Sequence, residues 1–192
     1  MKHLLILDNY DSFTYNLYHL IEKFFDGKIA VIRNDKINIS EIENFDAIVF
    51  SPGPKLPKDA GFMMDIIHHY HTTIPMLGIC LGMQAIAQYF NSTLSQLPVP
   101  IHGQSTDITI IRNDIVFLNC PKEFKIGRYH SWGVILDNLN SNLAALAIDK
   151  NNLVMACKHI QYNIYGIQYH PESILSEYGD VIISNWINQI NK

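Results

Sequence analysis

Short apolar runs alternate with segments of helical periodicity in the first half of the chain. The runs typical of buried strands lie at 3–8, 28–33, 46–51 and 75–79. Apolar residues spaced three and four apart predict helices at 12–25, 59–71 and 81–90, and a short helix is expected at 40–45. Asp11 or Ser12 is the expected cap of the first helix. Strands that alternate with helices in this way predict right-handed βαβ units and a parallel sheet.

The second half of the chain has a different pattern, in which turn residues separate short strand-like pieces. These lie at 107–111, 114–118, 124–129, 133–136, 143–148, 153–158 and 163–169. They predict antiparallel additions to the sheet, and a last helix is expected from Tyr178 to Ile190. The predicted fold class is α/β with three layers, built as one domain over residues 1–192 around a mostly parallel sheet with antiparallel additions.

Composition and charge narrow the possible functions. Of the 192 residues 48% are hydrophobic and 17% are charged, and the formal net charge is −4. This balance gives no reason to expect a nucleic-acid or membrane partner. The N-terminal apolar run ends at Asp8 without a cleavage site, so we expect a cytoplasmic protein. Three cysteines without paired spacing, and no CxxC or HxxxH motif, predict neither disulfides nor a metal site.

The most informative segment places Cys80 between a buried strand and a helix. Gly78 and Gly82 flank the cysteine at two positions on either side. This is the strand–turn–helix pattern of a nucleophile elbow, in which the partial positive charge of the helix N-terminus favours a thiolate. The backbone N–H of Leu81 is a candidate donor to an oxyanion. The plainer interpretation is a small buried cysteine in a turn.

A possible base lies near the C-terminus, in the sequence His170-Pro171-Glu172. A cysteine hydrolase needs a group that takes the thiol proton and later protonates the leaving amine. In extended backbone Glu172 projects to the same side as His170, so its carboxylate is placed to orient the imidazole. Two alternatives stay open at this point: a surface histidine followed by a turn, and His130 as the base.

The loop after the third parallel strand offers a second oxyanion donor. It reads Ser51-Pro52-Gly53-Pro54, and because proline has no N–H, the free amide in it belongs to Gly53. The loop lies at the carboxyl end of a strand, where open α/β sheets bind ligands. We therefore predict that the Gly53 and Leu81 amides act together. A rigid turn without function is the alternative.

These segments together resemble the class I glutamine amidotransferases. The resemblance spans essentially the whole chain and is carried by SPGP at 51–54, GICLGMQ at 78–84 and GIQYHPES at 166–173. It implies a flavodoxin-like three-layer fold and a Cys80-His170-Glu172 triad that hydrolyses L-glutamine and releases ammonia. The residues implied to contact glutamine are Pro52, Gly53, Pro54, Gln84, Ser131 and Trp132. Neither a metal nor an organic cofactor is implied.

Three positions depart from the pattern of that family. Lys55 stands where glycine is common, Gln104 where lysine is common and Trp132 where leucine is usual. None of the three belongs to the implied triad. Lys55 and Trp132 are expected to alter the affinity for glutamine or the coupling to a partner.

A narrower resemblance indicates the acceptor of the ammonia. DNYDSFTYNL at 8–17, RND at 33–35, RYHS at 128–131 and ESIL at 172–175 resemble the glutaminase subunits of anthranilate synthase and of aminodeoxychorismate synthase. This implies a hetero-complex with a chorismate-using synthase subunit, and we favour the anthranilate role. In the loop that follows the first strand, Tyr10 is the expected exposed aromatic and Phe13 is expected in the core.

The alternatives fall into several classes. A glutaminase for aminodeoxychorismate synthase, or one shared by both synthases, keeps the chemistry and changes the partner. A free-standing γ-glutamyl hydrolase is disfavoured by the DNYDSF loop, and an inactive scaffold is disfavoured because Cys80, His170 and Glu172 are all present. A flavodoxin-like binding module would need a phosphate-cradling loop after the first strand, where this chain has an acidic sequence without glycine.

Overall fold

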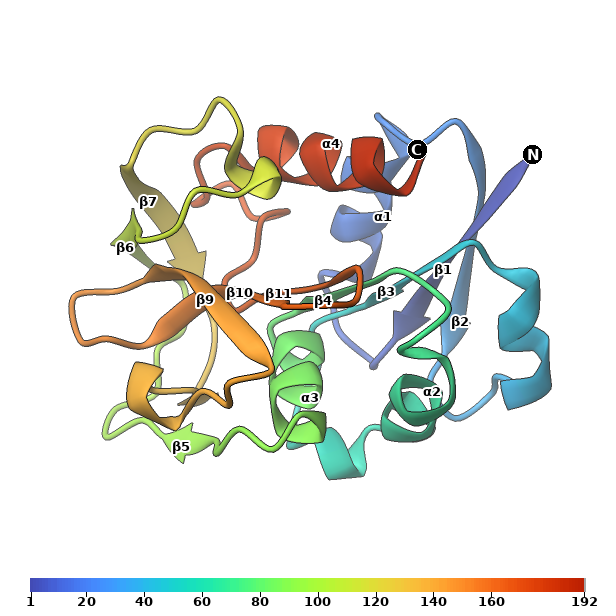
Figure 1. Cartoon of the computed structure of the whole chain (residues 1–192), viewed down its shortest axis with the longest axis horizontal. Coiled ribbons are helices and arrows are strands. Elements are labelled where there is room, and N and C mark those ends of the chain that lie inside the picture. Colours follow the sequence, from blue (N-terminus) through green and yellow to red (C-terminus); the bar gives the residue numbers. More distant parts are fainter. Residues whose placement is uncertain (192) are drawn as a thin grey trace.

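A nine-stranded sheet runs through the whole molecule (Figure 1). The fold is that of a computed structural model, and the structure describes residues 1–191. The strands of the sheet are β1 (Lys2–Asp8), β2 (Gly27–Arg33), β3 (Ala47–Phe50), β4 (Met76–Ile79), β6 (Gln104–Ile110), β7 (Glu123–Arg128), β9 (Leu143–Ile148), β10 (Val154–His159) and β11 (Ile164–Ile167). Two short strands, β5 (Ser95–Gln96) and β8 (Trp132–Gly133), form a separate antiparallel pair.

The sheet has a parallel half and an antiparallel half. Its spatial order is β2-β1-β3-β4-β11-β10-β9-β6-β7. The first five strands in this order are mutually parallel, and each later neighbour pairs antiparallel. This confirms the predicted α/β sheet with antiparallel additions. Because β3, β4 and β11 are adjacent and parallel, the loops that leave their carboxyl ends meet at one edge.

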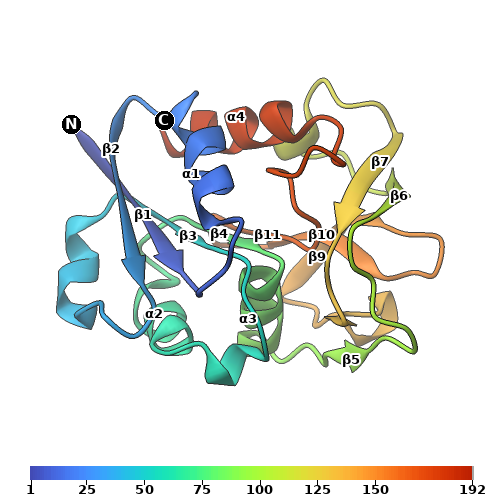
Figure 2. The same cartoon turned by 180° about the vertical axis from the view of Figure 1, so that it is seen from behind.

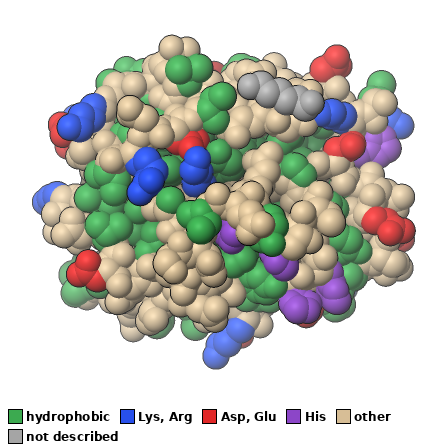
Figure 3. Space-filling model, in the orientation of Figure 1, with side chains coloured by type: hydrophobic (Ala, Val, Ile, Leu, Met, Phe, Trp, Pro, Cys, Tyr) green, Lys and Arg blue, Asp and Glu red, His purple; other side chains and the backbone are tan. Residues whose placement is uncertain are grey.

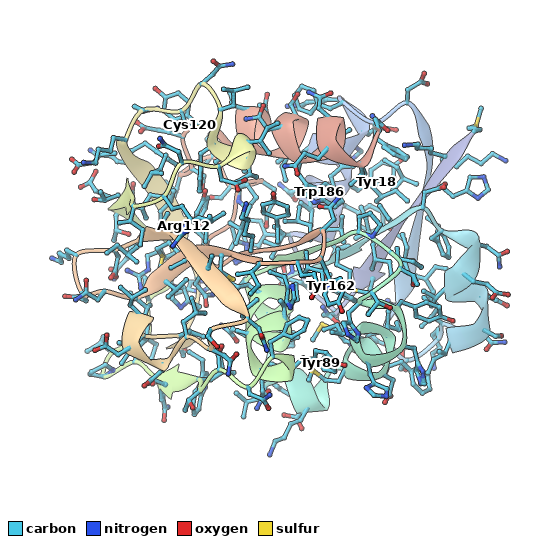
Figure 4. All side chains as sticks on the ribbon, in the orientation of Figure 1. Tyr18, Tyr89, Arg112, Cys120, Tyr162 and Trp186 are labelled. Atoms are coloured by element: carbon cyan, nitrogen blue, oxygen red, sulfur yellow. The ribbon has the colours of Figure 1, made fainter. Side chains whose placement is uncertain are left out.

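Four helices cover the two faces of the sheet (Figures 1 and 2). The helices α1 (Thr14–Glu22) and α4 (Gly179–Ile190) lie on one face, and α2 (Met63–Tyr70) and α3 (Leu81–Tyr89) lie on the other. In β1, Leu4 and Ile6 pack with the first pair of helices, and Leu5 and Leu7 pack with the second. Figure 4 shows Trp186 beneath α4, where the indole is fully buried against the sheet.

Several predicted elements differ from the structure, each for a local reason. Residues 114–118 were expected as a strand, but Ile115–Phe117 form a 3-10 helix because the Asp114 carboxylate accepts a hydrogen bond from the N–H of Val116. The pattern missed β5, and of the strand expected at 133–136 only Gly133 lies in a strand, the two-residue β8. The predicted helix at 59–71 begins at Met63, and a 3-10 turn at Pro57–Asp59 precedes it. A further 3-10 helix occupies Ile39–Asn44, where a short helix was expected.

The expected cap of the first helix is also wrong. The residue that precedes α1 is Phe13, and no side chain caps it. The Asp11 carboxylate accepts the Phe13 N–H instead, while Asp8 accepts the hydroxyl of Thr14. Both aspartates thus organise the loop between β1 and α1. Among residues 1–191, no helix is both long and apolar enough to cross a membrane.

Close packing of glycines fixes the junction between β4 and α3. A Cβ on Gly78 would lie 2.3 Å from the carbonyl carbon of Gly82, and a Cβ on Gly82 would lie 2.6 Å from the Cβ of Phe50. Neither contact is sterically possible, so the two glycines let α3 sit directly on β3 and β4.

Gly82→Ala is therefore expected to destabilise the chain. Forcing a methyl group against the Phe50 backbone should cost about 1–3 kcal/mol of unfolding free energy, since overpacking is relieved only by moving the helix. Denaturant unfolding measures this loss. The matched control is Gln88→Ala on the exposed side of the same helix, where a change within about 0.5 kcal/mol is expected. Equal stability of the two variants would contradict the packing described here.

Candidate active site

Cys80 occupies the sharp turn between β4 and α3. Its backbone has φ +52° and ψ −100°, a strained conformation that side-chain-bearing residues rarely adopt. The turn is held because the Cys80 N–H donates to the carbonyl of Ile167, 2.8 Å away at the end of β11. The predicted nucleophile elbow is thus present, with the thiol at the N-terminus of a nine-residue helix.

His170 and Glu172 follow β11, the strand next to β4. The Nδ1 atom of His170 lies 2.7 Å from Oε1 of Glu172, and both side chains are almost completely buried. A carboxylate at Nδ1 leaves Nε2 as the nitrogen that can exchange a proton. The ring is also fixed through its backbone, because the His170 N–H donates to the carbonyl of Gly127.

The electrostatics of His170 couple it to Cys80. Burial lowers the pKa of the imidazole, but hydrogen bonding to the Cys80 and Glu172 side chains, with their negative charges, outweighs burial and raises the pKa to about 10. At neutral pH the ring is therefore an imidazolium, held between a carboxylate and the sulfur. The structure brings together the three residues on which the sequence prediction of a triad rested.

Two aromatic rings enclose the imidazole. The ring centroids of Phe13 and Tyr129 lie 5.2 Å and 4.8 Å from that of His170, both in edge-on geometry. The prediction that Phe13 packs in the core is wrong. The loop after β1 runs over the carboxyl edge of the sheet, so Phe13 is half-buried and covers the imidazole. Tyr10 is 48% exposed, as expected, and its hydroxyl donates to Asp35.

A cavity of about 240 Å³ opens beside the thiol. It is lined by Gly53, Pro54, Lys55, Cys80, Gln84, Tyr129, His130, Ser131 and Trp132. Five of the six residues predicted to bind glutamine are among them. Pro52 is the exception, because it is buried in the loop behind Gly53. Two of the three residues that differ from the family pattern, Lys55 and Trp132, also line the cavity. The third, Gln104, lies at the start of β6.

The two predicted oxyanion donors are neighbours. A Cβ on Gly53 would come within 2.8 Å of the Leu81 side chain, so the loop after β3 rests against the first residue of α3. The N–H groups of the first helical turn have no acceptor within their helix. The carbonyl of Pro52 accepts a hydrogen bond from Ser51 Oγ at 2.7 Å, on the side of the peptide away from the Gly53 N–H. Ser51 thereby fixes the orientation of the Pro52–Gly53 peptide.

His130 lies in a different environment from His170. Its Nε2 atom accepts from Nε of Arg128 at 3.1 Å, and its Nδ1 atom lies 2.8 Å from the Trp132 carbonyl. Arg128 in turn donates to Asp149 at 2.7 Å, and all three side chains are buried. Because arginine can only donate, the Nε2 atom of His130 is occupied as an acceptor and has no free lone pair for a thiol proton.

The burial of His130 predicts an acid-sensitive fold. Burial and the charge of Arg128 lower its pKa to about 4, whereas in the unfolded chain the pKa is near 6.5. The unfolded chain therefore binds the extra proton first, and stability is lost as the pH falls from about 6.5 to 4. Across this window we expect the wild type to lose up to about 1.4 kcal/mol per pH unit more than His130→Gln. Urea unfolding at several pH values measures the difference, and parallel curves would contradict it.

Four of the other histidines, His68, His69, His71 and His159, cluster around the start of β4, at the edge of the sheet opposite the thiol. Figure 3 shows histidines gathered on the face of the molecule over α2. His71 precedes β4 and packs against Tyr89 and Tyr162, whereas Cys80 follows β4, about 13 Å further along the strand. These histidines are therefore too far from the thiol to exchange its proton. In the part of the chain that the structure describes, no group of three or more His, Cys, Asp or Glu side chains is arranged to hold a metal ion.

Three further residues of the site were not predicted from the sequence: Gln168, Arg128 and Tyr129. Gln168 Nε2 lies 3.6 Å from the sulfur of Cys80. The signal was present, because Gln168 stands two residues before His170 and an extended chain places the two side chains on the same side. Arg128 and Tyr129 lie far from Cys80 in the sequence, and only the antiparallel half of the sheet brings them to it.

Comparisons with known proteins agree with this geometry. Residues 5–190 match the family model described as glutamine amidotransferase class-I. The chain is 38% identical to anthranilate synthase component 2 of Porphyra purpurea, over 96% of this chain and 98% of the relative. It is 37% identical to aminodeoxychorismate synthase component 2 of Escherichia coli, over 97% of this chain and all of the relative. A solved structure from Thermoplasma acidophilum, described as one subunit of a GMP synthase, superposes with a TM-score of 0.88 at 26% identity and covers all of this chain and 94% of its own. The chain belongs to the class I glutamine amidotransferase family.

Proposed function

We propose that this protein hydrolyses L-glutamine to glutamate and passes the ammonia to a chorismate-using synthase subunit. The observation that supports the chemistry best is the buried Cys80, His170 and Glu172 set beside a cavity large enough for an amino acid. Membership of the class I family supports the same reaction.

In the proposed reaction, His170 holds the proton of Cys80 on Nε2, so the sulfur is a thiolate. The thiolate attacks the side-chain carbonyl carbon of glutamine, and a C–S bond forms as the carbonyl oxygen takes the negative charge. The intermediate collapses, the C–N bond breaks and the His170 proton leaves with ammonia. Water then gives a proton to the same ring and attacks the glutamyl thioester, and the C–S bond breaks to release glutamate and restore the thiolate beside the protonated ring. Glu172 keeps the imidazole oriented throughout.

The backbone amides of Gly53 and Leu81 are proposed to stabilise the oxyanion. Both are fixed donors that need no rearrangement when the charge develops, which is the condition for effective stabilisation. The hydrogen bond from Ser51 Oγ to the Pro52 carbonyl supports this role, since it fixes the Pro52–Gly53 peptide and with it the direction of the Gly53 N–H.

The remaining cavity residues are proposed to hold the amino-acid part of glutamine. These are Pro54, Gln84, Ser131 and Trp132, while Pro52, which does not line the cavity, acts through the loop that it shares with Gly53. Lys55 has φ +68°, the left-handed conformation that glycine adopts without cost. Lys55 lines the cavity, and its side chain carries a positive charge that the usual glycine lacks, which favours binding of an α-carboxylate.

The synthase subunit is proposed to dock over Glu172. The surface there is hollowed between α1 and the segment after β11, and it exposes Tyr15 (62%), Ile174 (99%) and Tyr178 (40%). Exposed aromatic and aliphatic side chains around a hollow are typical of a protein interface. Glu172 and Tyr129 line this hollow and also contact the His170 ring, so only these side chains would separate a docked partner from the imidazole.

Two acceptors fit this proposal. We favour the chorismate-using subunit of anthranilate synthase, and the alternative is that of aminodeoxychorismate synthase. Relatives of both names match at nearly equal identity over nearly their full length.

Glutamate release by the purified chain, with and without each synthase subunit, tests the proposal. We expect little activity alone and strong stimulation by one subunit, which would name the pathway. Stimulation by both would mean a shared subunit. Full activity of the isolated chain would contradict the need for a partner. Binding without any glutamate release would favour an inactive scaffold.

A further inference from the structure

A chain of buried hydrogen bonds links the nucleophile to an ion pair in the antiparallel half of the sheet. It runs from Asp149 through Arg128 and His130 to the Trp132 carbonyl, and then through Gln84 and Gln168 to the sulfur of Cys80. Each side chain in it is no more than 5% exposed. The direction of each bond follows from the donors and acceptors that these groups carry.

The first half of this chain fixes the proton of His130. Arg128 can only donate, so the Nε2 atom of His130 accepts and its hydrogen lies on Nδ1. That hydrogen points to the Trp132 carbonyl at 2.8 Å. Asp149 holds Arg128 in place and accepts two backbone N–H groups, those of Asn151 and Leu153.

The second half fixes the amide of Gln168. Gln84 donates from Nε2 to the Trp132 carbonyl at 2.8 Å and to Oε1 of Gln168 at 3.3 Å, so both of its amide hydrogens are used. The oxygen of Gln168 thus faces Gln84, and its NH2 group must face the thiol. Gln168 Nε2 lies 3.6 Å from the Cys80 sulfur, within hydrogen-bond range for sulfur.

We propose that Gln168 is a further catalytic residue, which donates a hydrogen bond to the Cys80 sulfur and stabilises its thiolate form. Arg128, His130 and Asp149 are positioning residues that act through Gln84. A sulfur that receives a donor on one side and faces an imidazolium on the other is best satisfied as an anion. The inference rests on the proposed function only for the role of Cys80 as nucleophile.

The reactivity of Cys80 without glutamine tests this inference. Mass spectrometry of the Cys80 peptide gives the rate of its alkylation by iodoacetamide at pH 7. This rate reports the fraction of Cys80 that is present as the thiolate. Gln168→Met keeps the volume and removes the donor, so we expect the rate to fall about tenfold, as for the loss of one charge-assisted hydrogen bond. The alkylation rate of Gln168→Glu should fall further, because this substitution places a like charge beside the sulfur. Gln84→Met should give a smaller fall, because it frees the Gln168 amide to rotate.

The matched control is Gln161→Met on the exposed turn before β11, for which the rate should not change. A wild-type alkylation rate in folded Gln168→Met would overturn the inference. If that variant does not fold, the side-chain amide signal of Gln168 in the unchanged chain decides by NMR. The chemical shift of this signal should change with pH, with the same midpoint as the pH dependence of Cys80 alkylation. A chemical shift that does not change with pH would overturn the inference. Altered alkylation in a chain that releases no glutamate would instead reject the proposed function alone.

Discussion

Cys80→Ser is expected to abolish glutamine-dependent synthesis by the complex while synthesis from added ammonia continues. The hydroxyl fits the space of the thiol, so the turn with φ +52° and the bond to Ile167 should persist. Serine is a far weaker nucleophile beside an imidazolium, because it is not ionised at neutral pH. Glutamate release should fall at least about 10⁴-fold, as expected when the nucleophile of a triad is removed.

The ammonia reaction separates the possible outcomes of this experiment. Loss of both reactions would mean that Cys80 holds the structure rather than attacks glutamine. The control is Cys120→Ser, a half-buried cysteine whose thiol pKa is raised by burial to about 11. It should retain the full rate, since Cys120 lies in the loop before β7 (Figure 4) and is not among the residues that line the cavity.

His170→Gln is expected to lower kcat for glutamine hydrolysis by about 10² to 10⁴-fold. Glutamine can still hydrogen-bond Glu172, but it cannot carry the proton from the thiol to the leaving ammonia. Glu172→Ala should lower kcat less than His170→Gln does. It removes the group that orients the imidazole but leaves the ring able to transfer a proton. Steady-state glutamate release with the stimulating synthase subunit measures both. An equal or larger loss in Glu172→Ala would require the two roles to be reassigned.

Much of the parallel half of the fold follows from local sequence. The apolar runs of β1, β3 and β4 are continuous because both faces of these strands are covered, and the helices between them have clear periodicity. The apolar residues of Ile115–Phe117 suit a strand, so the pattern predicts one where the structure has a 3-10 helix. A single aspartate side chain, that of Asp114, sets its first turn. Two-residue strands such as β5 carry no detectable pattern at all.

The candidate site was predictable where its parts lie close in sequence. Gly78, Cys80 and Gly82 lie within one strand–turn–helix junction, and His170 and Glu172 lie together in the segment that follows β11. Arg128 and His130 lie two residues apart, but Asp149 lies 21 residues from Arg128, and buried hydrogen bonds join the three. Sequence analysis therefore left His130 open as a base, and the donor from Arg128 makes that role chemically unsuitable.

The most direct test is to trap the intermediate on the chain itself. The protein and its stimulating synthase subunit would be mixed with isotope-labelled L-glutamine, quenched in acid within one turnover, digested and examined by mass spectrometry. We expect the label as a glutamyl thioester on the peptide that contains Cys80, lost on treatment with hydroxylamine and absent in Cys80→Ser. Label on another residue, or turnover without any labelled peptide in repeated quenches, would contradict a reaction that passes through Cys80.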